Sequence, residues 1–157
     1  MEFRILGPLE LRDDRGAIEI PGVKRRALLA LLLLHANEVV SSDRLMDELW
    51  GDQPPGSGVT ALQVSVSKLR KALGPAAGAL ATSSRGYVLR LGPDELDLHR
   101  FERLVETASS ADAEQAAATL REALSLWRGP PLAEFAYESF AQAPIGRLEE
   151  LRLAALE

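Results

Sequence analysis

The chain has 157 residues and a formal net charge of −5, and 46% of its residues are hydrophobic. This hydrophobic fraction is typical of globular domains and argues against a disordered chain. The length allows one ordinary domain or two small ones. The sequence contains no cysteine, which excludes disulfide bonds and thiolate metal sites.

The sequence predicts neither a signal peptide nor a membrane-spanning helix. Residues 1–11 lack the basic and apolar regions of a signal peptide. The longest apolar run, residues 27–34, has eight residues, whereas a membrane-spanning helix needs about 20. We therefore expect a cytoplasmic protein with no membrane partner.

The charge is divided unevenly along the chain. Residues 1–92 contain twelve Lys or Arg and ten Asp or Glu, a net charge of +2. Residues 93–157 contain six and thirteen, a net charge of −7. A local basic surface is therefore compatible with the acidic total. The change of sign near Leu91, Gly92 and Pro93 predicts two domains, 1–92 and 93–157.

The first domain is expected to begin with strands and continue with helices. Alternating apolar and polar residues predict short strands at 2–6, 9–12 and 17–20, separated by Gly and Asp turns. Residues 24–36 predict a core helix, because its leucines leave almost no polar face. Ser41 or Ser42 is expected to cap a helix that ends at Trp50. A Gly- and Pro-rich loop, residues 51–58, follows; it exceeds the turn of about 3–4 residues in a plain helix-turn-helix.

The next predicted helix, residues 60–73, has one apolar face and one polar, basic face. Its inward residues are Leu62, Val66, Leu69 and Leu73, at helical spacing. The opposite face carries Thr60, Gln63, Val64, Ser67, Lys68 and Lys71, with Arg70 on the flank. In a DNA major groove, Val64 would suit a thymine methyl group and Gln63 a base edge. Lys68, Arg70 and Lys71 would hold phosphates, although an ordinary solvated helix shows the same pattern.

A β-hairpin is expected directly after this helix, with strands at 79–81 and 86–90. Tyr87 and Leu89 are predicted to point inward and Val88 outward. Arg85 lies in the turn, where it would reach a minor groove or its phosphates; the alternative is an exposed turn arginine without a role. The order helix, strand, turn, strand is that of the end of a winged helix, which favours DNA binding.

Several motifs over residues 1–92 occur together in the order found in one family. These are FRILGPLEL, LALLLLHANEVVSSDRLMDELWG, LQVSVSKLRKALG and RGYVL. Together they resemble the OmpR/PhoB-type winged-helix domain and, more closely, the SARP activators (Streptomyces antibiotic regulatory proteins). The resemblance implies a transcriptional activator of secondary metabolism that binds direct repeats as side-by-side dimers.

The resemblance also assigns roles to residues. The recognition helix falls on residues 60–73 and the wing arginine on Arg85. The loop matches the segment that contacts the RNA polymerase sigma factor, here Asp52, Gln53, Pro54, Pro55, Gly56 and Ser57. The family's helices often carry arginines where this chain has Thr60, Ser65 and Ser67, so the target sequence does not transfer.

The second half of the chain predicts helices. One covers residues 94–110, with Leu98, Phe101, Leu104 and Val105 inward. A second covers 114–127 behind a cap at Ser110 or Asp112, with Ala117, Leu120, Leu124 and Trp127 inward. A third carries Ile145, Leu148, Leu151 and Ala155. With its WRGPPLAEF motif, this half resembles the start of the bacterial transcriptional activation domain, a TPR-like array. We expect either a fragment of a longer regulator or a last helix that packs against the wing domain.

Enzymatic chemistry finds little support in the sequence. His35 and His99 lack a motif-like serine or carboxylate partner, and no phosphate loop or metal-ligand spacing occurs. We therefore expect no enzyme, no cofactor and no metal. The fold class expected is mostly α with small β-sheets, a winged helix followed by TPR-like helices. The functions left open are a DNA-binding activator that recruits polymerase and, alternatively, a protein-interaction adaptor without specific DNA binding.

Overall fold

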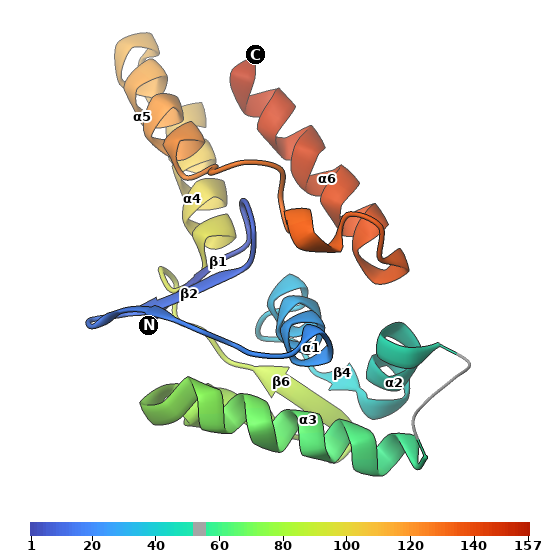
Figure 1. The fold of residues 1–157 in the computed structure, drawn as a ribbon. Coiled ribbons are helices and arrows are strands. Elements are labelled where there is room, and N and C mark those ends of the chain that lie inside the picture. The colour runs from blue at the N-terminus through green and yellow to red at the C-terminus, as the bar shows by residue number, and fades with distance from the viewer. Residues whose placement is uncertain (52–55) are drawn as a thin grey trace. The chain divides into compact units, whose positions relative to one another are not determined.

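The computed structural model describes residues 1–51 and 56–157. The chain forms two compact units (Figure 1). The first contains Met1 and residues 12–91, and the second contains residues 2–11 and 92–157. The fold is mostly α-helical with two small β-sheets, in agreement with the expected fold class. No helix in the described ranges is long and apolar enough to cross a membrane.

Three helices make the core of the first unit: α1 (Val23–Leu34), α2 (Ser42–Trp50) and α3 (Gly58–Leu73). The helix α1 is the predicted core helix, since Ala27 to Leu33 are all at most 5% exposed. The N-cap of α2 is Ser41, whose Oγ accepts a hydrogen bond from the Arg44 amide at 3.1 Å. A 3-10 helix, η1 (Gly74–Ala79), follows α3.

The sheet of the first unit has the strand order β4-β6-β5. Its strands are β4 (Val40–Ser41), β5 (Leu80–Thr82) and β6 (Gly86–Leu89), all antiparallel. Contrary to expectation Val88 is buried, at 3% exposed. The reason is that the central strand β6 is covered along its whole length, so that period-2 alternation is lost. Helix α3, followed by the β5–β6 hairpin, completes a winged helix, and we call this hairpin the wing.

Gly86 fixes how closely β4 approaches the wing. A Cβ atom at this position would lie 2.0 Å from the Val40 carbonyl oxygen and 2.8 Å from the Ser41 Cα. Gly86 pairs with Ser41 across the sheet, so that only a residue without a side chain allows this backbone approach.

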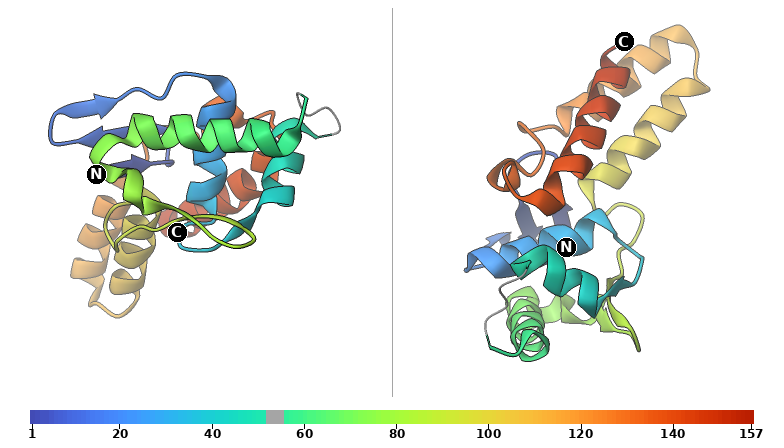
Figure 2. Two further views of the ribbon diagram at one scale, coloured as in Figure 1. Left: turned by 90° about the horizontal axis from the view of Figure 1, so that it is seen from below. Right: turned by 90° about the vertical axis from the view of Figure 1, so that its right-hand side faces the viewer.

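The second unit consists mainly of helices: α4 (Asp97–Ser109), α5 (Ala113–Ser125) and α6 (Ser139–Leu156), with a 3-10 turn, η2 (Ala133–Phe135). Helices α4 and α5 form a TPR-like antiparallel hairpin (Figures 1 and 2). Asp112 caps α5 by accepting a hydrogen bond from the Gln115 amide at 2.9 Å. Phe101 and Trp127 meet edge to face, with ring centroids 5.4 Å apart.

Two helix faces in this unit differ from those predicted. Ala117 is exposed, whereas Ala123 is fully buried. The helix begins AEQAAATL, and so many alanines give the polarity pattern little power to orient it. Leu151 is 41% exposed, although Leu148 and Ala155 of the same helix are buried as expected.

The N-terminal strands are β1 (Glu2–Arg4), β2 (Glu10–Asp13) and β3 (Gly16–Ile18), in the order β1-β2-β3. Residues 2–11 belong to the second unit, where the Phe3 amide donates to the Glu95 carbonyl at 2.7 Å. The Leu132 amide donates to the carbonyls of Ile5 and Gly7 at 3.1 and 2.8 Å. This segment is therefore bonded to the α4 start and to the loop after α5.

A buried carboxylate anchors the same segment. Asp97, at 2% exposed, accepts hydrogen bonds from the amides of Ile5 and Leu6 at 2.9 and 3.0 Å. Burial raises the pKa of Asp97 above its ordinary value, while these two hydrogen bonds and the charge of Arg128 act in the opposite direction. The carboxylate thus satisfies two backbone donors that would otherwise be buried without a partner.

Candidate nucleic-acid interface

Helix α3 is held in place by its inward face and by its caps. Leu62, Val66, Leu69 and Leu73 are at most 2% exposed, as predicted. The Ser57 Oγ accepts a hydrogen bond from the Thr60 amide at 3.4 Å, and Gly74 ends the helix at φ 58°. Because both ends and the inner face are fixed, the outer face is presented in one orientation.

The outer face of α3 is exposed at all six positions predicted to lie on it. These positions are Thr60, Gln63, Val64, Ser67, Lys68 and Lys71. Val64 is 44% exposed although it is apolar. Polar groups thus surround one apolar group on this face, an arrangement that suits a base edge beside a thymine methyl group.

The wing lies beside α3 and is closed by a tight turn. The Ser83 amide donates to the Gly86 carbonyl at 2.8 Å, which leaves Ser84 and Arg85 at the tip. The Arg85 side chain is exposed, and its carbonyl accepts a hydrogen bond from the Ser42 amide at 3.0 Å. The start of α2 therefore fixes the backbone of the wing tip while leaving the Arg85 guanidinium in solvent.

Arg70 is placed differently from the other cations of α3. Its Nε donates to the Leu80 carbonyl at 3.0 Å, and its Nη2 donates to the Thr82 Oγ1 at 2.8 Å. Arg70 therefore ties α3 to strand β5. Sequence analysis missed this role, because nothing in the local pattern pairs Arg70 with residues ten and twelve positions later. Its predicted phosphate contact stays a prediction.

The charge of this region is one-sided. Residues 56–85, from the start of the described loop to the wing tip, contain four Lys or Arg and no Asp or Glu. Within the described part of the chain, the side chains of Lys68, Lys71 and Arg85 make no ion pair. Unpaired cations beside exposed polar side chains attract a polyanion such as a nucleic-acid backbone.

The loop expected to contact polymerase falls largely on residues that are not described. Asp52, Gln53, Pro54 and Pro55 lie outside the described residues. Gly56 and Ser57 are described and exposed, and Ser57 is the cap of α3. The segment thus leads directly into the candidate recognition helix.

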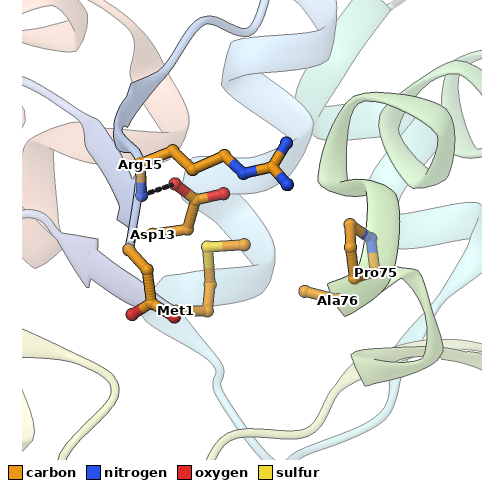
Figure 3. Close-up of a pocket in the computed structure, with 6 residues that line it drawn as sticks. Met1, Asp13, Arg15, Pro75 and Ala76 are labelled. Atoms are coloured by element: carbon orange, nitrogen blue, oxygen red, sulfur yellow. Dashed lines mark hydrogen bonds between the residues drawn. The ribbon is translucent and has the colours of Figure 1, made fainter.

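A pocket of about 430 Å³ lies between the β2–β3 turn and η1 (Figure 3). Asp13 accepts a hydrogen bond from the Arg15 amide at 2.8 Å, so that its carboxylate closes its own turn. The opposite wall consists of Pro75 and Ala76. Across residues 1–51 and 56–157, no group of three His, Cys, Asp or Glu side chains is placed to hold a metal ion. Neither observation adds a chemical site to the α3–wing surface.

Two family models match the chain in succession. Residues 21–89 match "Transcriptional regulatory protein, C terminal", and residues 96–157 match "Bacterial transcriptional activator domain". The first match includes α3 and the wing, and the second begins at the start of α4. The order of the two models is the order predicted from the motifs.

Curated relatives align with the whole chain. Regulatory protein DnrI of Streptomyces peucetius is 36% identical over 100% of this chain and 62% of its own length. Regulatory protein AfsR of Streptomyces coelicolor is 38% identical over 100% of this chain and 16% of its own. This chain therefore spans less than two thirds of these relatives.

A solved structure has the same fold. It is "Mycobacterium tuberculosis EmbR in complex with low affinity phosphopeptide", at 34% identity and a TM-score of 0.89. The similarity covers 98% of this chain and 43% of that chain.

Proposed function

This chain belongs to the SARP family of transcriptional regulators, and we propose that it binds double-stranded DNA with sequence preference and activates transcription. The observation that carries the proposal is the exposed outer face of α3, whose Lys68 and Lys71 are unpaired, beside a wing whose tip carries Arg85. A helix of this diameter fits the DNA major groove.

Each part of the surface has a distinct role in this proposal. Thr60, Gln63, Val64 and Ser67 lie against base edges, where hydrogen bonds and methyl contacts carry sequence information. Lys68 and Lys71 neutralise phosphates, and Arg85 reaches the minor groove or its phosphates. Arg70 holds the wing against α3, and its own phosphate contact is left to experiment.

Selection from a pool of random duplexes at two salt concentrations tests the proposal. We expect an enriched sequence and, for the proposed side-by-side dimer on direct repeats, two copies spaced by about one helical turn. Enrichment of a single copy would leave DNA recognition intact and reject the dimer. Weak, unenriched binding that vanishes with salt would reduce the interaction to phosphate attraction and favour the adaptor function.

Two kinds of variant separate base reading from phosphate contact. Lys68→Ala is expected to weaken binding to all duplexes. It is also expected to reduce by about 1 the magnitude of the salt slope, which is the change in the logarithm of the binding constant with the logarithm of salt concentration. Gln63→Ala and Val64→Ala are expected instead to change which sequence is enriched, with the salt slope unchanged. An unchanged affinity and salt slope for Lys68→Ala would contradict the docking of α3.

Recruitment of RNA polymerase is the second part of the proposal. It rests on the position of residues 51–57 directly before α3 and on their resemblance to the segment of SARP activators that contacts the sigma factor. A pull-down of sigma factor with the chain on its selected duplex tests it. Substitution of residues 52–56 by a Gly/Ser linker of equal length, which keeps the Ser57 cap of α3, is expected to abolish capture and preserve DNA binding.

A further inference from the structure

A cationic hollow lies on one flank of α3. It is lined by Glu19, Pro21 and Arg25 from the β3–α1 segment and by Lys68, Lys71 and Ala72 from α3, and we call these residues the α1–α3 hollow. All six lie in the first unit. Three cations face one carboxylate there, so that the hollow favours an anion.

The hollow and the wing lie on opposite sides of α3. Each residue of a helix advances by about 100°, which places Lys68 and Arg70 about 160° apart around the axis. Lys68 lines the hollow, whereas Arg70 is bonded to strand β5 of the wing. Seen from below, α3 lies between the wing and the segment that leads from β3 to α1 (Figure 2, left). The outer face of α3 is thus bordered by a cationic group on each side.

Arg25 differs from Lys24, the cation before it in sequence, in its hydrogen bonding. Lys24 donates a hydrogen bond from its Nζ to the Leu49 carbonyl at the end of α2. Arg25 makes no ion pair or side-chain hydrogen bond within the described residues, and its guanidinium lies over Gly22, about 3.7 Å from where a Cβ would stand. Lys24 is therefore part of the fold, while the Arg25 guanidinium has all its donors available.

We propose that Arg25, together with Lys68 and Lys71, binds a DNA backbone phosphate on the side of α3 opposite the wing. The inference rests on the proposed docking of α3 and adds a contact from α1. Phosphate backbones border the major groove on both sides, so that a helix lying in the groove meets one on each flank. Arg85 then contacts one strand and the α1–α3 hollow the other. Arg25 thereby positions the helix and carries no base specificity.

The test compares variants of the full chain on a duplex of arbitrary sequence, about three helical turns long. For Arg25→Ala we expect several-fold weaker binding and a salt slope lower by about 0.9, one phosphate contact. Arg25→Lys keeps the cation and is expected to retain the slope. Arg90→Ala removes an equal charge from an exposed arginine of the same unit and is expected to leave the slope unchanged. Thermal unfolding of each variant checks that it is folded.

The outcomes distinguish this inference from the proposed function. If Lys68→Ala lowers the slope and Arg25→Ala does not, α3 docks as proposed but the Arg25 contact is rejected. If neither variant changes the slope, both proposals fail. If Arg25→Ala and Arg90→Ala lower it equally, the effect is one of total charge and the contact is again rejected.

Phosphate-ethylation interference on the selected duplex gives an independent readout. We expect Arg25→Ala to remove interference at phosphates of one strand, and Arg85→Ala at phosphates of the other. Loss at the same phosphates for both variants would overturn the assignment of the hollow to the opposite strand. Selection from the random pool is expected to return the same enriched sequence for Arg25→Ala as for the unaltered chain.

Discussion

Basic side chains around the N-terminal strands differ from those on α3 and the wing in whether they form ion pairs. In the second unit, Arg4 pairs with Glu2 at 2.9 Å, Arg100 pairs with Glu2 at 3.5 Å, and Arg128 pairs with Glu10 at 3.0 Å. On α3 and the wing, Lys68, Lys71 and Arg85 make no ion pair within the described residues.

The cations around the N-terminal strands are therefore paired within the fold, whereas those of α3 and the wing are left with an uncompensated charge. Net charge alone gives no such distinction, because both kinds of residue count equally in the total of −5. Arg70 differs from both groups, since it belongs to the candidate recognition helix and yet is hydrogen-bonded within the unit.

The largest effect is expected from a change that moves the wing without altering any charge. Gly86→Ala places a methyl group against the Val40 carbonyl oxygen, and we expect a loss of about 3 kcal/mol or more in the free energy of unfolding, because a backbone atom cannot rotate away. Chemical denaturation measures it. Gly78→Ala is the control, since a Cβ there meets nothing within 4 Å; equal losses for both variants would contradict the close approach.

A smaller loss is expected in the second unit. Asp97→Asn leaves one acceptor oxygen for two amides and turns an N–H group toward the other, which costs about 2 kcal/mol. Hydrogen exchange at the Ile5 and Leu6 amides should accelerate, which reports on the anchored segment itself. Asp94→Asn removes an exposed pair with Arg103 and is expected to cost less than about 1 kcal/mol; unaltered exchange in Asp97→Asn would refute the anchor.

Arg70 directly tests the difference between cations that stabilise the fold and cations that stay unpaired. Arg70→Ala is expected to lower the free energy of unfolding by about 1 kcal/mol, through loss of two hydrogen bonds that are partly open to solvent. Its salt slope for DNA binding should stay unchanged, whereas that of Lys71→Ala should fall by about 1. A fall for Arg70→Ala as well would establish the phosphate contact predicted from sequence.

The smallest effect concerns pH. Burial raises the pKa of Asp97 in the folded state, so that its contribution to stability is fully present below the ordinary carboxyl pKa and is lost as pH rises through the raised value. The difference between the unaltered chain and Asp97→Asn isolates the contribution of this carboxyl group. We expect that difference to shrink as pH rises; a difference independent of pH would contradict the raised pKa.

Several features of both units follow from local pattern. The buried positions of α3, the cap Ser41 of α2, the cap Asp112 of α5, and the exposure of Val64 all result from spacings of three or four residues. These spacings also selected the outer face of α3 as the candidate interface. Local pattern suffices here because each feature is determined within one helix turn.

The bonds between distant segments could not be predicted in this way. The Asp97 carboxylate meets amides more than 90 positions away in sequence, and the sequence shows an acidic residue at a helix start, which is common at exposed positions. Arg25 likewise joins Lys68 and Lys71 only through folding. A single sequence carries no information on which distant residues meet.

Residues 2–11 form hydrogen bonds with residues between 95 and 134. This long sequence separation has a consequence during synthesis. Residues 2–11 leave the ribosome before Asp97 and Leu132, their hydrogen-bond partners. At about 5–20 residues per second, the delay amounts to roughly ten seconds. Throughout that time three side chains that are fully buried in the folded protein are exposed and accessible to chaperones: Phe3, Ile5 and Leu6. On a ribosome paused before Leu132, the residues of the first unit would therefore already be synthesised, whereas the N-terminal segment would still lack its hydrogen-bond partner Leu132.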